Sequence, residues 1–421
     1  MCRIISAIIC TVLIIPGLIA QETLQIPDDG WRLWPDTAAD WENDTLYLPD
    51  EVNLDKIPVN IPTGGWEILT PTSGREVELP ATVEQYYWGN FGFRPYKNAY
   101  YFEEEDNQVQ NGNYPGVSWW WIEFDIPENF QDKQITLFIR AARLRAEVYL
   151  NRQLVGYHII GETSFICDLT AAAKPGEKNL LAIRITNPGG RFDWVDTGYL
   201  EWGDYRLHAS HGFGGLDRGI ILTAHDPVYL SDLWTASTPD IKTIIVHGKI
   251  TSKTDEPVSY QCKIRLLEYD SDRIIREIET EWGTLTAYGT ATLQEKISYP
   301  DAAVWNIDSP NLYRAELEVI SGLKQKKKEW VDKRQVTCAF RWFEAAGIDE
   351  NALLLLNGER IRLISAISWG FWGLNGLWPT PELAEKEVLA AKAFGMNCIN
   401  FHRNIGKTEV LEAQDRLGLL R

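Results

Sequence analysis

The C-terminal stretch, residues 341–421, constrains the fold of this chain most, because strand-like and helix-like patterns alternate there. The sequence first predicts a pair of strands over residues 351–368, with a turn at Asn357-Gly358, and then a helix that Thr380 caps and Gly395 ends. A short buried strand (396–401) and a second helix (408–417), which ends at Gly418, follow. Residues 419–421 are the expected start of a third strand. Such repeats are typical of a parallel sheet or a (β/α)8 barrel. A closed barrel takes about 250 residues, so this stretch can supply only its first units.

The composition indicates a soluble protein with several domains. A length of 421 residues, with 45% hydrophobic and 24% charged side chains, is ordinary for a globular chain of this kind. The net charge of −18 argues against nucleic acid or an anionic membrane as a partner, because both attract basic surfaces. The 18 Trp residues are more than usual; most are expected in the core, and some can serve as flat faces on which sugar rings stack.

The N-terminus has the pattern of a secretory signal peptide. Arg3 precedes an apolar run over residues 4–15, and Pro16-Gly17 and Ala20 follow. The run is too short for a comfortable membrane span, and Ala20 suits a cleavage site. We therefore predict a signal peptide over residues 1–20, cleavage near Ala20, a secreted or periplasmic protein, and no membrane insertion after cleavage.

The cysteines predict neither a disulfide framework nor a metal site. Four remain after the predicted cleavage, and each lies far from the others inside an apolar strand pattern: Cys167, Cys262, Cys338 and Cys398. Buried free thiols fit this spacing, since metal-binding cysteines cluster within a few residues of one another. We predict no cofactor and no metal, and the oligomeric state stays open.

Two β-rich segments precede the C-terminal stretch. The full division that the sequence predicts is a signal peptide (1–20), an extended N-terminal arm (21–62), an antiparallel sandwich of short alternating strands (63–227), a sandwich of about seven strands and immunoglobulin-like size (228–340), and the first βα units of a barrel (341–421). The arm is expected to lie across a folded domain, because it is polar and shows little periodicity.

Several motifs resemble those of glycoside hydrolase family 2, which includes β-galactosidases, β-glucuronidases and β-mannosidases. The resemblance rests on WWWIEF (119–124), AEVYLN with LVG (146–156), PGEKNLLAIR (175–184), GGLDR (214–218), Trp305 with SPNLY (309–313), TPEL (380–383) and DRLGL (415–419), which occur in the family's order. It implies a multidomain, mainly β architecture with a jelly-roll sugar-binding sandwich, an immunoglobulin-like sandwich and an incomplete (β/α)8 TIM barrel. It also implies hydrolysis of O-glycosyl bonds with a carbohydrate or glycan as partner.

The resemblance supplies no catalytic residue within this chain. Retaining glycosidases place two carboxyl groups about 5 to 5.5 Å apart, one as acid/base and one as nucleophile. In the family both are Glu on later barrel strands, and neither has a matching position before Arg421, so both are expected beyond it. The first strand here ends in Ile367-Ser368-Trp369-Gly370, and Asn400 stands where relatives have Arg. By itself, this polypeptide is predicted to be inactive.

A partial substrate pocket is the functional prediction that remains. Trp369 and Trp372 could stack on sugar rings, and Asn400, His402 and Arg403 could bind hydroxyl or carboxylate groups. A structural role, in which His402 and Arg403 bond neighbouring strand ends, explains these two residues equally well. In the acidic, aromatic loop 193–204, Glu201 and Asp204 are candidate acceptors of sugar hydroxyls, although a solvated loop is the favoured interpretation for each of them.

Three hypotheses of different kinds fit the sequence. The first is a secreted family 2 glycoside hydrolase of which this chain is a fragment. The second is a non-catalytic secreted carbohydrate-binding or scaffold protein, and the third is a decayed gene product without a stable C-terminal fold. The apolar Leu419-Leu420 needs neighbouring strands, and exposed strand edges favour aggregation, so the first hypothesis is favoured.

Overall fold

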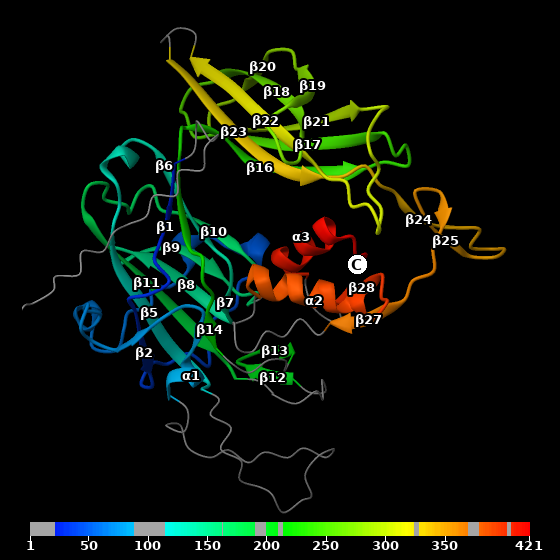
Figure 1. Cartoon of the computed structure of the whole chain (residues 1–421). Helices are drawn as coiled ribbons and strands as arrows, with labels where there is room; N and C mark the ends of the chain where they lie inside the picture. Colours follow the sequence, from blue (N-terminus) through cyan, green and yellow to red (C-terminus); the bar gives the residue numbers. More distant parts are fainter. Residues whose placement is uncertain are drawn as a thin grey trace, which may run out of the picture. The chain divides into compact units, whose positions relative to one another are not determined.

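The computed structural model of the chain describes residues 22–87, 114–161, 163–189, 199–208, 214–323, 328–368, 379–401 and 406–421. The protein is mainly β, and its helices are concentrated near the C-terminal end (Figure 1). It divides into two compact units. The first lies within Thr23–Thr223, and the second begins at Ala224 and includes the C-terminal helices.

The first unit is built on two sheets of short strands. The larger has the order β3 (Arg75–Val77), β2 (Trp31–Asp36), β5 (Gly116–Asp125), β11 (Lys178–Asn187), β8 (Arg145–Leu150), β9 (Gln153–His158). The smaller has the order β1 (Glu22–Gln25), β15 (Ile221–His225), β6 (Gln134–Ile139), β10 (Phe165–Asp168). Shorter elements complete it: η1 (Pro49–Glu51), η2 (Leu54–Lys56), η3 (Trp66–Ile68), η4 (Glu128–Phe130), α1 (Val83–Tyr87), the sheet β4 (Ala81–Thr82), β14 (Gly215–Leu216), β7 (Ala142–Arg143), and the pair β12 (Tyr199–Trp202), β13 (Tyr205–His208).

The prediction of an extended N-terminal arm over residues 21–62 needs correction, because part of this stretch belongs to the sheets. Strand β2 pairs antiparallel with β5, with Trp34 opposite Trp119, and β1 joins the smaller sheet. The run Trp31-Arg32-Leu33-Trp34 alternates buried and half-buried side chains, which suits a strand that packs on both faces. Only the stretch after β2 runs as loops and single turns.

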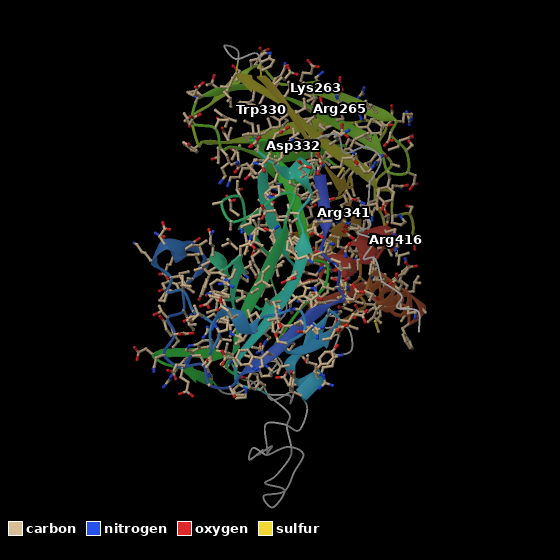
Figure 2. The ribbon with its side chains drawn as sticks, turned by 90° about the vertical axis from the view of Figure 1, so that its left-hand side faces the viewer. Lys263, Arg265, Trp330, Asp332, Arg341 and Arg416 are labelled. Carbon is tan, nitrogen blue, oxygen red and sulfur yellow. The ribbon has the colours of Figure 1, made fainter. Side chains whose placement is uncertain are left out.

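The second unit begins with two antiparallel sheets around one core. The first sheet has the order β16 (Val228–Ser237), β17 (Thr243–Ser252), β21 (Thr290–Ser298), and the second has the order β19 (Ile274–Glu279), β18 (Val258–Glu268), β22 (Tyr313–Leu323), β23 (Lys328–Cys338), with β20 (Gly283–Leu285) also on β18. Asp332 of β23, which Figure 2 labels, joins the sheets, since its Oδ2 accepts the Leu230 N–H at 2.7 Å. Buried side chains from both sheets form the core, including Val246, Ile264 and Leu317.

The C-terminal stretch confirms the predicted βα pattern. Its elements are β24 (Phe343–Ala346), β25 (Leu353–Leu356), β26 (Glu359–Arg360), β27 (Ser365–Ser368), α2 (Pro381–Ala393), β28 (Cys398–Phe401) and α3 (Thr408–Leu417). Strands β27 and β28 are parallel, and Leu420 adds a parallel bridge to Cys398 as the start of a third strand. Thr380 caps α2 as predicted, because its Oγ1 accepts the Leu383 N–H at 3.2 Å. Figure 1 shows α2 and α3 beside these strands.

A small apolar cluster joins this βα stretch to the preceding sandwich. Trp305 is fully buried with Ala339 and Leu356, and Leu420 packs against the same group. The Trp305 indole donates a hydrogen bond to the carbonyl of Asp415 on α3 at 2.7 Å. Arg341 lies 4.6 Å from the Trp305 ring centroid and forms a 2.8 Å ion pair with the Asp415 carboxylate (Figure 2 labels Arg341).

We expect Gly418→Ala to destabilise the protein by about 1 to 3 kcal/mol. The backbone at this position is left-handed, so an alanine side chain would be strained there and would also clash with its neighbours. Gly418 has φ +74°, and a Cβ there would lie 2.1 Å from the Ile307 carbonyl oxygen. Gly395 is the matched control, since it has φ +78° but nothing within 4 Å of its Cβ position. Chemical denaturation should show a larger loss for Gly418→Ala than for Gly395→Ala. Equal losses would mean that the contact with Ile307 is unimportant.

Two observations on the described residues complete the fold. Cys167, Cys262, Cys338 and Cys398 are all buried and free, as predicted. None of the helices in these parts of the chain has the length and apolar character that crossing a membrane requires.

Candidate functional site

The carboxyl ends of β27 and β28 place one predicted site residue on an open face. Asn400 is exposed on β28 and lies opposite Ile367 of β27, which is 55% exposed. The neighbouring Ile399 points the other way, into the apolar cluster formed with α2 and α3. Because side chains alternate along a strand, Asn400 and Ile367 share the face turned away from the helices. The Asn400 amide can therefore donate to and accept from a ligand on that face.

A partly buried polar contact fixes the end of β27 to helix α2. The Ser368 hydroxyl donates to Glu387 Oε1 at 2.9 Å. Burial raises the pKa of the Glu387 carboxyl, and the Ser368 hydrogen bond opposes this effect. Glu387 projects from α2 toward the helix side of the strands, opposite to Asn400. It therefore holds the strand end in place rather than facing the open side.

Four predicted binding residues lie outside the residues that the structure describes. They are Trp369, Trp372, His402 and Arg403. Their roles stay predictions. The segments that carry them follow directly after β27 and β28, the two strand ends just described.

The remaining two candidates belong to the β12–β13 hairpin of the first unit. Glu201 pairs with Arg206 in the backbone register, and Asp204 is exposed at the turn. The hairpin is anchored by Trp202, which is 1% exposed and packs edge-on against Trp41 with ring centroids 5.3 Å apart. The structure thus presents the Asp204 carboxylate to solvent on an anchored turn. Asp204 belongs to the first unit and Asn400 to the second.

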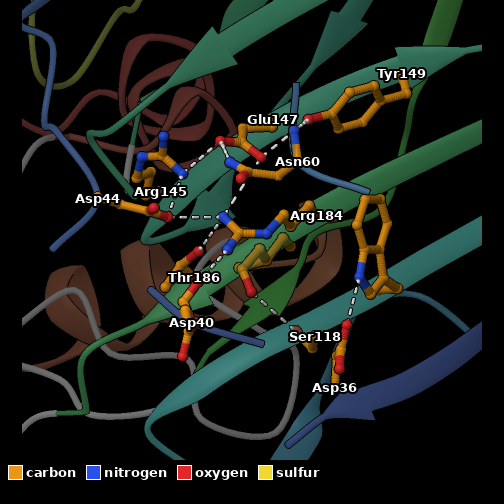
Figure 3. A network of polar contacts seen from close by, with 12 residues as sticks. Asp36, Asp40, Asp44, Asn60, Ser118, Arg145, Glu147, Tyr149, Arg184 and Thr186 are labelled. Carbon is orange, nitrogen blue, oxygen red and sulfur yellow. Dashed lines mark hydrogen bonds and ion pairs between the residues drawn. The ribbon is translucent and has the colours of Figure 1, made fainter. Parts of the chain in front are cut away.

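A buried ionic network, which the sequence analysis missed, covers one face of the larger sheet (Figure 3). The side chains of Arg145 and Arg184 are each 2% exposed, and both contact Asp44 Oδ2, at 3.2 and 3.0 Å. Glu147 is fully buried and lies 2.5 Å from Arg145 and 3.4 Å from Arg184. Two cations therefore face two anions, so the charges of these four residues cancel.

Neutral partners complete the network. Asn60 Nδ2 donates to Glu147 Oε1 at 2.7 Å, the Tyr149 hydroxyl donates to Glu147 Oε2 at 3.1 Å, and Arg184 donates to Thr186 at 3.0 Å. Burial, and then the Glu147 charge, raise the pKa of the Tyr149 hydroxyl, so it stays a donor. The residues Asp44 and Asn60 come from the loop stretch after β2, which the network ties to the sheet.

A sequence signal for this network did exist. Arg145, Glu147 and Tyr149 recur at every second position of a strand whose six residues are all buried. Charged residues of opposite sign at this spacing share one face, and buried charges are normally paired. The pattern therefore indicated a buried ion pair, although it did not indicate Asp44, which is 140 residues from Arg184.

The described residues offer groups for binding hydroxyls rather than for holding a metal. No set of three His, Cys, Asp or Glu side chains within the described ranges could hold an ion. The candidate ligand groups are the Asn400 amide and the Asp204 carboxylate. Both are hydrogen-bonding groups of the kind that bind sugar hydroxyls.

Glycoside hydrolases are among the known proteins to which this chain is similar. Residues 228–341 match the family model described as glycosyl hydrolases family 2. A β-galactosidase of Thermoanaerobacter pseudethanolicus is 24% identical over 386 residues, which cover 90% of this chain and 45% of that protein. A β-glucuronidase of Formosa agariphila is 24% identical over 270 residues, covering 62% of this chain and 26% of that protein.

Solved structures show the same fold. The β-glucuronidase of Bacteroides uniformis gives a TM-score of 0.66 at 21% identity, covering 95% of this chain and 42% of that one. A structure described as a putative β-galactosidase of Bacteroides fragilis gives 0.67 at 16% identity, covering 95% and 52%.

The architecture defines a multidomain protein in which β-sheet domains precede a βα segment. Together with the match over residues 228–341, it makes the chain similar to glycoside hydrolase family 2, which confirms the resemblance seen in the sequence. The chain spans less than half the length of the two curated relatives described above.

Proposed function

We propose that this chain is the N-terminal, carbohydrate-binding part of a family 2 glycosidase that hydrolyses O-glycosyl bonds. The observation that carries the proposal is the similarity to a β-galactosidase along 90% of the chain, which is far more than one shared domain. In this proposal the first unit is a jelly-roll sugar-binding sandwich, residues 228–340 form an immunoglobulin-like sandwich, and the C-terminal stretch is the beginning of a (β/α)8 barrel. The partner is a carbohydrate, and the protein is exported by its N-terminal signal peptide.

The chemistry of the proposed enzyme is retaining hydrolysis. One carboxyl group protonates the leaving oxygen while a second carboxylate attacks the anomeric carbon, and water then releases the sugar. No residue of this chain is assigned to either role. The contribution proposed for the chain is binding: Asn400 on the open strand face and Asp204 on the anchored hairpin would accept or donate hydrogen bonds to sugar hydroxyls.

The test combines glycan binding with hydrolysis. The purified chain would be titrated with β-linked galactosides and glucuronides by isothermal calorimetry, and incubated with the corresponding nitrophenyl glycosides. We expect weak binding, reduced by Asn400→Ala, and no turnover. Asn306→Ala is the control, because Asn306 is a turn residue with no assigned role in binding.

Each outcome decides a part of the proposal. Turnover by the chain alone would overturn the assignment of catalysis to residues that it lacks. Absence of binding to every glycoside tested would overturn the binding role. Binding that Asn400→Ala leaves intact would move the site away from the β27 and β28 strand ends.

A further inference from the structure

Helix α1 carries a buried carboxyl group that belongs to no candidate binding site. Glu84 is 1% exposed. Its Oε1 accepts the backbone N–H of Tyr114 at 3.0 Å, and its backbone neighbour Val83 donates to the Gly214 carbonyl at 3.0 Å. The Glu84 Oε2 atom, although buried, has no hydrogen-bond partner. An ionised carboxylate in this position would be poorly compensated.

A buried amide extends the same cluster toward the end of β11. Asn187 Oδ1 accepts from Arg143 Nη1 at 3.2 Å and from the Gly189 N–H at 3.2 Å. Its Nδ2 donates to the Tyr114 carbonyl at 3.2 Å. Tyr114 is thus bound on both sides, by Glu84 at its N–H and by Asn187 at its carbonyl. We call Glu84, Tyr114, Arg143 and Asn187 the polar hub.

The hub holds both ends of the chain segment that carries the β12–β13 hairpin. On the side before the hairpin, Asn187 binds the Gly189 N–H. On the side after it, Gly214 packs so closely on Asn187 that a Cβ at Gly214 would lie 2.7 Å from the Asn187 Cβ. Gly215 then pairs with Thr82 and Arg143 in the sheet β4-β14-β7. Among the described side chains, the Trp41–Trp202 contact is a further anchor of the hairpin.

We propose that the polar hub positions the β12–β13 hairpin, and that loss of the Glu84 proton loosens it. The hub and its response to protons are independent of what the protein binds. The consequence for a ligand rests on the proposed function, because Asp204 at the hairpin turn would then present its carboxylate from a less ordered position.

The proton response follows from the burial of Glu84. Burial raises the pKa of Glu84 from 4.5 to about 7, against the opposing effects of the backbone N–H groups of Tyr114, Glu84 and Gly214 and of the Arg143 charge. Arg143 is the cation that faces it from β7; Asp36 of β2 is the other acidic group near the Tyr114 ring. When the hub opens, Glu84 becomes hydrated and its pKa returns toward 4.5. Opening therefore releases a proton between these two values and becomes easier as the pH rises through that range.

Hydrogen exchange of the whole chain tests this. Peptides covering 81–87, 114–118, 187–189, 199–208 and 214–216 would be followed from pH 5 to 8.5, with rates corrected for intrinsic exchange at each pH. We expect the opening equilibrium constant to rise roughly tenfold per pH unit up to about pH 7 and then to level off. In Glu84→Gln, whose amide cannot ionise, the constant should not depend on pH. The matched control Glu128→Gln alters an exposed side chain and should keep the wild-type profile.

A second variant separates positioning from the proton response. Asn187→Ala removes the bond to Gly189, so we expect faster exchange in 199–208 at every pH, with the pH slope retained. A slope that persists in Glu84→Gln would show that another group titrates. An opening equilibrium constant that does not change with pH in the wild type would overturn the proton response. If the constant changes with pH in the peptides of the hub but not in residues 199–208, the hub does not position the hairpin.

Discussion

Glu147→Ala is expected to lower the free energy of unfolding of the first unit by about 3 to 5 kcal/mol, a large share of the stability of a typical domain. Glu147 is fully buried and contacts both Arg145 and Arg184. Without it, two guanidinium groups share Asp44 alone, and one positive charge is left uncompensated inside the protein. The desolvation cost of that charge produces the loss, together with the unsatisfied Asn60 amide.

The measurement is chemical denaturation, with Glu123→Ala as the matched control. Glu123 lies on the same sheet, but its partner Lys178 is exposed and 3.9 Å away, so its removal should cost less than about 1 kcal/mol. Added salt should leave the Glu147→Ala loss nearly unchanged, because buried pairs are weakly screened. A loss under about 1 kcal/mol would mean that the network is hydrated and adds little to stability.

The features that the sequence predicted well are those set by neighbours along the chain. Thr380 begins α2 and Gly418 closes α3 because a side-chain cap and a left-handed residue act within one turn of helix. The short strand expected around WWWIEF is likewise present as β5, although its residues from Gly116 to Ile122 are all buried and do not alternate with exposed ones. These signals need no knowledge of distant residues.

The features that the sequence did not predict depend on residues far apart in the chain. The pairing of β2 with β5 places Trp34 opposite Trp119, a distant partner that the local polarity of the predicted arm does not indicate. In the same way, Glu84 reads as an ordinary helix residue, and only its place beside Tyr114 makes it a buried acid. The candidate site was partly predicted: Asn400 lies on the expected strand end, whereas nothing local to Glu201 and Asp204 indicated the Trp41 anchor of their hairpin.

Trp305→Ala is expected to cost about 3 to 5 kcal/mol and to release helix α3 from the sandwich of the second unit. Trp305 is fully buried. Its indole packs in the cluster with Ala339 and Leu356 and donates a hydrogen bond to the Asp415 carbonyl. Truncation leaves a cavity, removes that hydrogen bond and takes away the ring beside Arg341. The helix Thr408–Leu417 would then depend on its contacts with α2 and β28, on the Arg341–Asp415 ion pair and on the packing of Gly418 against Ile307.

Hydrogen exchange resolves this effect because it reports stability helix by helix. We expect the protection of residues 408–417 from exchange to fall by far more than that of strands β18 and β22. The buried residues of these two strands belong to the core of the sandwich and not to the Trp305 cluster. Trp282→Ala is the control, since that side chain is 54% exposed and its loss should cost about 1 kcal/mol or less. If α3 exchanges as fast in the wild type as in Trp305→Ala, the cluster does not hold the helix. Unprotected exchange of α3 already in the wild type would mean that the βα stretch lacks a stable fold of its own, which is the third hypothesis that the sequence left open.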